Sequence, residues 1–195
     1  MNSDKMEFKI ELKYIWIFFG IILSILISYQ LYVHFKPVKT IFIRKNAFSF
    51  RQDIKKALNV EIFPREDVLN QLFSNYRIKN VTILFKPGTP KTNTLYQLQT
   101  IEIVYKLSKY DHLTRKFFMP KKQFNAEPID SYENITREDT RLKIILVPPE
   151  FSNKTRVSAG GNRIWIYGKT DKEFDYAVMK AILSVMNITS LEGHV

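Results

Sequence analysis

The feature that most constrains this chain is a run of twenty positions without a formal charge, from Tyr14 to Val33. A helix rises about 1.5 Å per residue, so this run would extend over about 30 Å, the thickness of the hydrocarbon layer of a bilayer. Aromatic residues near both ends, with Lys13 and Lys36 beyond them, match the flanks of a membrane segment. The sequence therefore predicts a single-pass protein, with a short charged tail at 1–13 and a transmembrane helix at 14–34.

Two other interpretations of this run fit less well. A cleaved signal peptide would have a shorter apolar region and a small-residue cleavage site, and no Ala-x-Ala-like triplet follows the run. A buried core helix would carry a polar stripe, which is missing from this sequence. Gly20, Ser24 and Ser28 lie four residues apart and share one helix face, so we expect a helix-packing face through which two copies form a homodimer.

Two signals disagree about the side of the membrane on which the following domain lies. Basic residues are more numerous after the run than before it, which favours a cytoplasmic domain. However, four Asn-x-Ser/Thr motifs all follow the run, and such sites are glycosylated only on the far side of a membrane. We therefore predict an uncleaved signal-anchor with the N-terminus inside and the domain outside. The lipid bilayer is then one partner, and the candidate glycosylation sites are Asn80, Asn134, Asn153 and Asn187.

The composition limits the chemistry available to this chain. It has no cysteine, which excludes disulfides, thiolate metal sites and cysteine nucleophiles. The formal net charge of +11 favours anionic partners. This charge is spread along the chain, and spread charge is more typical of a solvated surface than of a nucleic-acid-binding stripe. We therefore disfavour nucleic acid as a partner, and we expect no cofactor.

Residues 38–195 are predicted to form one α+β domain. Two apolar runs joined by a Pro/Gly-containing loop, 78–85 and 98–107, indicate an antiparallel pair of strands. Residues 110–140 are polar and charged, and we expect an irregular region with one short strand near Phe124, the best candidate for a functional loop. Further strands are expected at 40–44 and 142–147, and helices at 49–58 and after Pro64.

The C-terminal part of the chain has the clearest pattern. Gly160-Gly161-Asn162 between two short alternating runs predicts a β-hairpin. Thr170 with Glu173 three residues later is a capping box that begins a helix with an apolar face. Helices among mainly antiparallel strands indicate a two-layer α/β sandwich with a mixed, mainly antiparallel sheet.

Few side chains have the spacing that catalysis or metal binding requires. The three histidines, His34, His112 and His194, have no helical i, i+4 partner, so we expect no metal site. Acidic residues at 138–139 and at 171–175 could supply paired carboxylates, although those in a first helical turn are favoured there by the helix dipole alone. A candidate aromatic and basic patch for stacking on sugars or bases, if it faces outward, consists of Trp165, Tyr167, Arg156, Arg163 and Lys169.

Three functions remain open from the sequence. The leading hypothesis is a structural or interaction module, held at the membrane or cell envelope, that binds another protein. The second is a membrane-bound enzyme, a carboxylate-based hydrolase of glycans or lipids. The third is a cytoplasm-facing basic module for nucleic acid or anionic lipid. Because no catalytic signature stands out, the sequence favours a protein that is not an enzyme.

Overall fold

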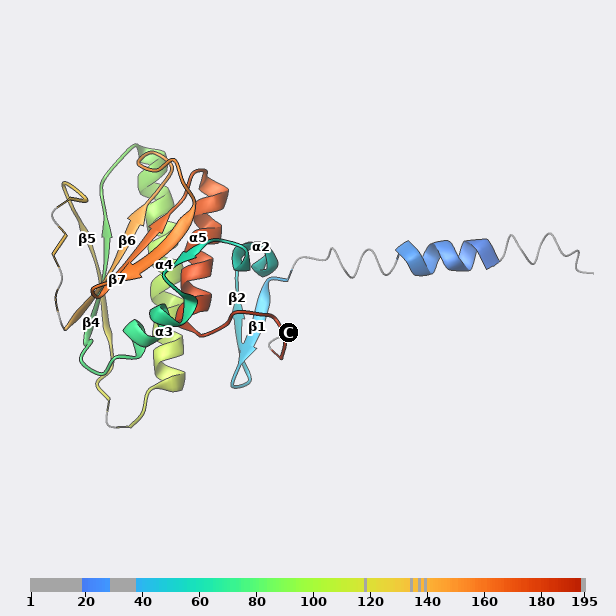
Figure 1. Cartoon of the computed structure of the whole chain (residues 1–195), viewed down its shortest axis with the longest axis horizontal. Helices are drawn as coiled ribbons and strands as arrows, with labels where there is room; N and C mark the ends of the chain where they lie inside the picture. Colours follow the sequence, from blue (N-terminus) through green and yellow to red (C-terminus); the bar gives the residue numbers. More distant parts are fainter. Residues whose placement is uncertain are drawn as a thin grey trace, which may run out of the picture. The chain divides into compact units, whose positions relative to one another are not determined.

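A computed structural model of the chain describes residues 19–28, 38–117, 119–133, 135–136, 138 and 140–193. Contacts divide the chain into two compact units, Met1–Pro37 and Val38–Val195. In the first unit, residues 19–28 are helical and all of them are exposed. The second unit contains the described strands and the helices α2 to α5 (Figure 1).

The prediction of a membrane-spanning helix at 14–34 requires correction. Within the described residues, no helix combines the length and the apolar character needed to cross a membrane. The remaining positions of the predicted span lie outside the described residues. The predicted single-pass topology, and the N-in, C-out orientation that depended on it, are overturned by this finding.

The main sheet has six strands in the order β3-β7-β8-β6-β4-β5. Within the described residues, four of its five neighbouring pairs are parallel, and the pair β7–β8 is antiparallel. The prediction of a mainly antiparallel sheet was therefore wrong, and the fold is mixed α/β. The strands are β3 (Ile62–Phe63), β4 (Asn80–Phe85), β5 (Gln123–Pro128), β6 (Arg141–Val147), β7 (Arg156–Gly160) and β8 (Arg163–Tyr167).

The predicted strand at 98–107 was also wrong, because these residues lie inside a 25-residue helix, α4 (Pro90–Thr114). The helix begins with two strong signals: Thr89 caps it by accepting a hydrogen bond from the backbone N–H of Thr92, and Pro90 occupies its first turn. Parallel neighbours such as β4 and β5 need a crossover connection, and α4 provides it. A hairpin at this point is therefore excluded by the topology.

The remaining helices are α2 (Ile54–Leu58), α3 (Glu66–Ser74) and α5 (Asp171–Val185). The predicted helix at 49–58 is shorter than expected, because Ser49 ends strand β2 (Asn46–Ser49) and the side chain of Asp53 caps α2 instead. Strand β2 pairs antiparallel with β1 (Thr40–Ile43) in a separate two-stranded sheet. Helices α4 and α5 run alongside each other against the main sheet (Figure 1).

Different parts of the chain pack on the two faces of the main sheet. Alternate strand residues such as Ile83 and Ile144 join the large core that also contains the buried faces of the helices α2 to α5. Their neighbours Leu84 and Ile145 belong to a smaller cluster on the opposite face, with side chains from the segment after β5. We call this second side the open face, because none of the described helices covers it.

Several local predictions were confirmed. The hairpin β7–β8 turns at Gly161 and Asn162, both with positive φ, as a two-residue hairpin turn requires. The Thr170 side chain accepts a hydrogen bond from the Glu173 N–H at the start of α5. The short strand near Phe124 is β5. The predicted apolar face of α5 is buried, at Phe174, Ala177, Val178, Ala181, Ile182 and Val185.

Candidate functional site

The outer face of α4 carries large apolar side chains that are open to solvent. Leu98, Ile101 and Tyr105 are 42%, 66% and 64% exposed. Their spacing of three and then four residues places them next to one another on one side of the helix. We call these three residues the α4 stripe. Single exposed apolar residues are common on proteins, whereas neighbouring ones make a surface a candidate for an interaction.

A shallow groove of about 680 Å³ lies beside the α4 stripe. Ile101 and Tyr105 form part of its wall, together with the partly buried Val104. His112 and Lys121 also line it and bring polar and basic character to the part nearest the C-terminal end of α4. The groove thus combines a long apolar wall with a cationic end.

The sequence contains a signal for this surface that the strand prediction missed. Residues 101–105 alternate in a strand-like way only because two faces of α4 are apolar, one buried and one exposed. The buried face includes Tyr96, Ile103, Leu107 and Tyr110. If the exposed and the buried apolar residues of α4 are assigned to separate rows at helical spacing, the sequence identifies the stripe.

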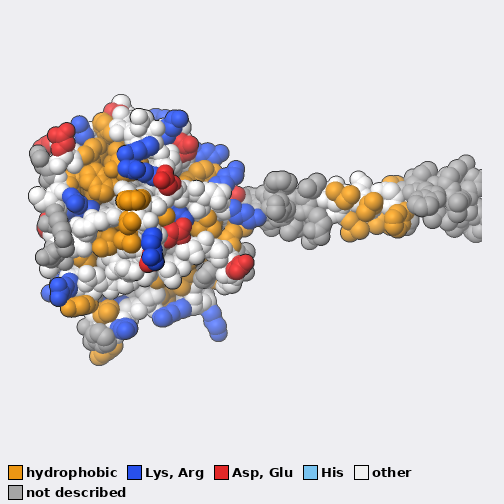
Figure 2. Space-filling model, in the orientation of Figure 1, with side chains coloured by type: hydrophobic (Ala, Val, Ile, Leu, Met, Phe, Trp, Pro, Cys, Tyr) orange, Lys and Arg blue, Asp and Glu red, His pale blue; other side chains and the backbone are white. Residues whose placement is uncertain are grey.

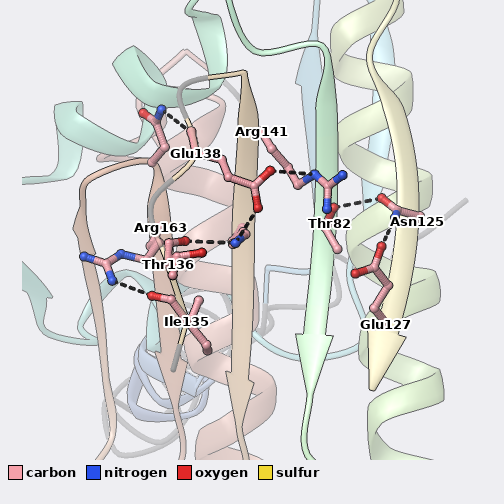
Figure 3. Close-up of polar contacts among 10 residues, drawn as sticks. Thr82, Asn125, Glu127, Ile135, Thr136, Glu138, Arg141 and Arg163 are labelled. Carbon is pink, nitrogen blue, oxygen red and sulfur yellow. Dashed lines mark hydrogen bonds and ion pairs between the residues drawn. The ribbon is translucent and has the colours of Figure 1, made fainter. Parts of the chain in front are cut away.

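On the open face, a polar network holds the segment after β5 against the sheet (Figure 3). Glu138 in that segment contacts two cations of β6, Lys143 Nζ at 2.7 Å and Arg141 Nε at 3.3 Å. Lys143 Nζ also donates a hydrogen bond to the Thr136 carbonyl at 2.8 Å. The hydrogen bond from Lys143 is the main reason that the pKa of Glu138 lies below its ordinary value. Glu138 is therefore an ionised, structural carboxylate at neutral pH.

Three further hydrogen bonds lie on the same side of the sheet (Figure 3). Arg163 on β8 donates through a terminal nitrogen to the Ile135 carbonyl at 2.9 Å. Thr82 on β4 donates to the side-chain oxygen of Asn125 at 2.9 Å, and the Asn125 amide donates to Glu127 at 2.5 Å. These contacts join β4 to β5, and β8 to the segment after β5, so the network has a bracing role.

The predicted aromatic and basic patch is partly assembled on the open face. The rings of Trp165 and Tyr167 stack with centroids 6.1 Å apart and planes 10° apart, and both side chains are partly buried. Lys154 Nζ lies 4.6 Å and the Arg156 guanidinium 5.5 Å from the Tyr167 ring centroid. Ile164 and Ile166 point to the helix-covered face instead. A binding role for these aromatic residues stays a prediction.

Other predicted patch and site residues do not converge. Arg163 is engaged with the segment after β5, as described above, and Lys169 is exposed in the turn before α5. Gly20, Ser24 and Ser28 are exposed on the helix at 19–28, and their role in dimer formation stays a prediction. Among the candidate glycosylation sites, Asn153 and Asn187 are exposed, Asn80 is partly buried in β4, and Asn134 lies outside the described residues.

The candidate carboxylates at 171–175 have structural partners. Asp171 pairs with Lys91 at 2.6 Å, and Asp175 accepts hydrogen bonds from the Gln52 and Gln99 side chains. Of the histidines, His112 lines the α4 groove, and His34 and His194 lie outside the described residues. In the described part of the chain, no group of three metal-ligating side chains comes together.

No protein-family model, curated protein or solved structure matches this chain. The functional assignment therefore depends on the geometry of the described surfaces.

Proposed function

We propose that Val38–Val195 is an interaction module that binds a helical segment of another protein along the α4 stripe. The observation that carries this proposal is the exposure of three large apolar side chains, Leu98, Ile101 and Tyr105, in one row on a 25-residue helix. A helix with an apolar row on its outer side is able to pack a second helix by the same i, i+3 and i+4 ridges that pack helices in protein cores.

The energetics favour a bound partner. Complete burial of one large apolar side chain contributes about 1.5–3 kcal/mol, and these three are about half exposed. Covering them would contribute a few kcal/mol before the entropy of association is subtracted. The surface is also rigid, because the opposite side of α4 is fixed in the core by Ile103 and Leu107. A preorganised surface loses little conformational entropy when it binds.

The charge around the groove indicates the chemistry of the partner. Lys121 is exposed at one end of the groove. Basic side chains are also spread among hydrophobic ones over the face shown in Figure 2, without forming one continuous stripe. A partner helix with apolar residues three and four positions apart, and carboxylates at one end, would complement this arrangement.

Position-specific photo-cross-linking in the native cell tests the proposal. A photoreactive amino acid at Ile101 or at Tyr105 should yield the same cross-linked protein. The matched control position is Lys172, which is exposed in the first turn of α5 and does not line the groove, and should yield none. Adding Leu98→Asp to the Ile101 photo-cross-linking variant should abolish the product, because a carboxylate in the row would have to be buried without a counter-ion.

Two outcomes would contradict the proposal. Equal cross-linking from Lys172 would show that the stripe has no special role. A product that consists of two copies of this chain would replace a heterotypic partner with a homodimer.

The other two functions find less support in the described residues. A glycan hydrolase needs a carboxylic acid with a raised pKa, whereas among the described residues the pKa values of Glu138 and Glu150 are shifted downward. A nucleic-acid-binding module would be supported by basic side chains gathered in one stripe, whereas on the face shown in Figure 2 they are spread among other side chains.

A further inference from the structure

A second hollow, unrelated to the α4 stripe, lies between α3, the C-terminal end of α4 and the loop that leads to β5. Its volume is about 200 Å³. For comparison, an apolar cavity of about 150 Å³ accepts a molecule of the size of benzene. Its lining residues come from α3, the turn after it, α4 and the α4–β5 loop, and include Phe73, Tyr76, Tyr110, Asp111, Met119 and Lys122. We call this hollow the α3–α4 pocket.

Two buried charges of opposite sign line this pocket. Asp111 is 7% exposed and Lys122 is 8% exposed. The contact that Asp111 makes is a long one, its Oδ2 accepting from the backbone N–H of Lys122 at 3.4 Å. Lys122 Nζ donates one hydrogen bond, of 2.9 Å, to the Ile78 carbonyl. Neither side chain forms an ion pair with any described residue, and the Lys122 ammonium also lies 5.2 Å from the centroid of the Phe73 ring.

The two charges share one pocket without a direct ion pair between them. A buried charge is ordinarily paired, because desolvation of an isolated carboxylate or ammonium is expensive. Burial lowers the pKa of Lys122, and the nearby Asp111 charge partly opposes this shift. The pocket therefore offers an acceptor in Asp111 and a donor in Lys122, each with few polar partners among the described residues.

We propose that the α3–α4 pocket binds a free amino acid with an apolar side chain. Its ammonium would bind to the Asp111 carboxylate and its carboxylate to the Lys122 ammonium. A zwitterion of this kind supplies both missing partners at once, and a molecule with one charge leaves the other buried group unsatisfied.

The rest of the lining fits the same ligand. The Phe73 ring lies 6.3 Å from the Tyr110 ring, centroid to centroid, and these rings offer an apolar wall for the ligand side chain. Arg115 and Lys116 also line the pocket and are more exposed than Lys122, so they would attract the carboxylate of an approaching ligand. The cavity volume limits the ligand to a single amino acid.

Isothermal titration calorimetry of the full chain with three related probes tests this proposal. L-leucine carries both charges, 4-methylpentanoate lacks the ammonium, and 3-methylbutylamine lacks the carboxylate. L-leucine should bind saturably, and each single-charge analogue should bind roughly tenfold more weakly or worse, because it lacks one charge-assisted interaction. Absence of saturable binding by L-leucine, L-methionine and L-phenylalanine would overturn the proposal, as would an analogue that binds as tightly as L-leucine.

A pair of matched variants adds a residue-specific readout. Asp111→Asn should weaken L-leucine binding roughly tenfold and remove its preference over 4-methylpentanoate, because the ammonium loses its counter-ion. Asp130→Asn makes the same charge change at an exposed position outside the pocket and should leave both affinities unchanged. An Asp111→Asn protein that keeps the preference for the zwitterion would contradict the assignment. The wild-type analogue series remains decisive if that variant fails to fold.

Discussion

The Glu150 carboxylate accepts a hydrogen bond of 2.6 Å from Thr92 Oγ1, which ties the loop after β6 to the first turn of α4. The same oxygen accepts from the backbone N–H of Thr89 at 3.1 Å. A carboxylate at a helix N-terminus satisfies free N–H groups and interacts favourably with the helix dipole. These hydrogen bonds hold the pKa of Glu150 below its ordinary value of 4.5, and the one from Thr92 has the largest effect.

This shift predicts a pH-dependent contribution to stability. Because the folded-state pKa of Glu150 is depressed, its contribution is fully present above the unfolded-state pKa and is lost as the pH falls through the folded-state value. Glu150→Gln should therefore lower the melting temperature at pH 7. The gap between wild type and variant should close as the pH falls below 4.5. If the difference in melting temperature stays constant across this pH range, the charge of Glu150 does not contribute to stability.

Gly88→Ala offers an independent route to the same interaction. A Cβ at this position would lie 2.4 Å from Glu150 Oε2, so the carboxylate would have to move away from Thr92. We expect Gly88→Ala to lower the melting temperature at pH 7 and to add little to the effect of Glu150→Gln in the double variant. Fully additive losses in thermal melts would contradict this coupling.

Gly168 should be intolerant of any side chain. A Cβ there would lie 2.3 Å from Phe174 Cβ and 2.4 Å from Phe174 Cα, and the backbone of α5 has no room to move away. Gly168→Ala should lower the free energy of unfolding by about 1–3 kcal/mol or more in urea titrations. Gly160→Ala is the matched control, because nothing lies within 4 Å of its Cβ position. Equal effects of the two substitutions would contradict the close approach of Gly168 to α5.

Lys180 should depend on its counter-ion. Its side chain is fully buried in α5, where Nζ contacts the Glu66 carboxylate and donates to the Leu58 carbonyl at 2.9 Å. Glu66→Ala should therefore destabilise the fold by about 3 kcal/mol, the lower end of the range for breaking a buried pair, since Glu66 is partly exposed. Adding Lys180→Met should restore much of the loss in urea titrations. A double variant less stable than Glu66→Ala alone would argue against an unpaired ammonium as the cause.

The two faces of α4 should respond differently to truncation. Ile103 is 1% exposed and Ile101 is 66% exposed, although they are two residues apart. Ile103→Ala should cost about 2–5 kcal/mol of stability, and Ile101→Ala should stay within about 0.5 kcal/mol of wild type. Chemical denaturation measures both. Similar losses at the two positions would contradict an exposed stripe.

The parts of the fold that the sequence predicted are those with local chemical signals. The Thr170 and Glu173 capping box and the Gly161-Asn162 turn each act over a few residues, and both appear in the structure. The helix α4 was missed because apolar residues on two of its faces mimic the alternation of a strand. The parallel pairing of β4 with β6 and β5 arises from crossovers through distant segments, which no local pattern encodes.

The candidate sites were harder to predict for the same reason. The α4 stripe exists only if residues 98–105 are helical, so the strand prediction concealed it. The α3–α4 pocket joins Asp111 and Lys122 within the stretch 110–140 that was expected to contain a functional loop. However, the burial of these two charges depends on the packing of α3 against α4, which sequence spacing does not reveal.

The most direct test is the size of the native complex that contains this protein. Blue-native electrophoresis or size-exclusion chromatography of tagged full-length protein should show wild type in a complex larger than its own mass. The double variant Ile101→Asp/Tyr105→Asp should lose this complex while it keeps the wild-type melting temperature, because both side chains are solvent-exposed. Phe63→Asp, at a residue of strand β3 that is 62% exposed and lies outside α4, should keep the complex. A double variant that keeps both its fold and the complex would contradict an interaction module that acts through α4.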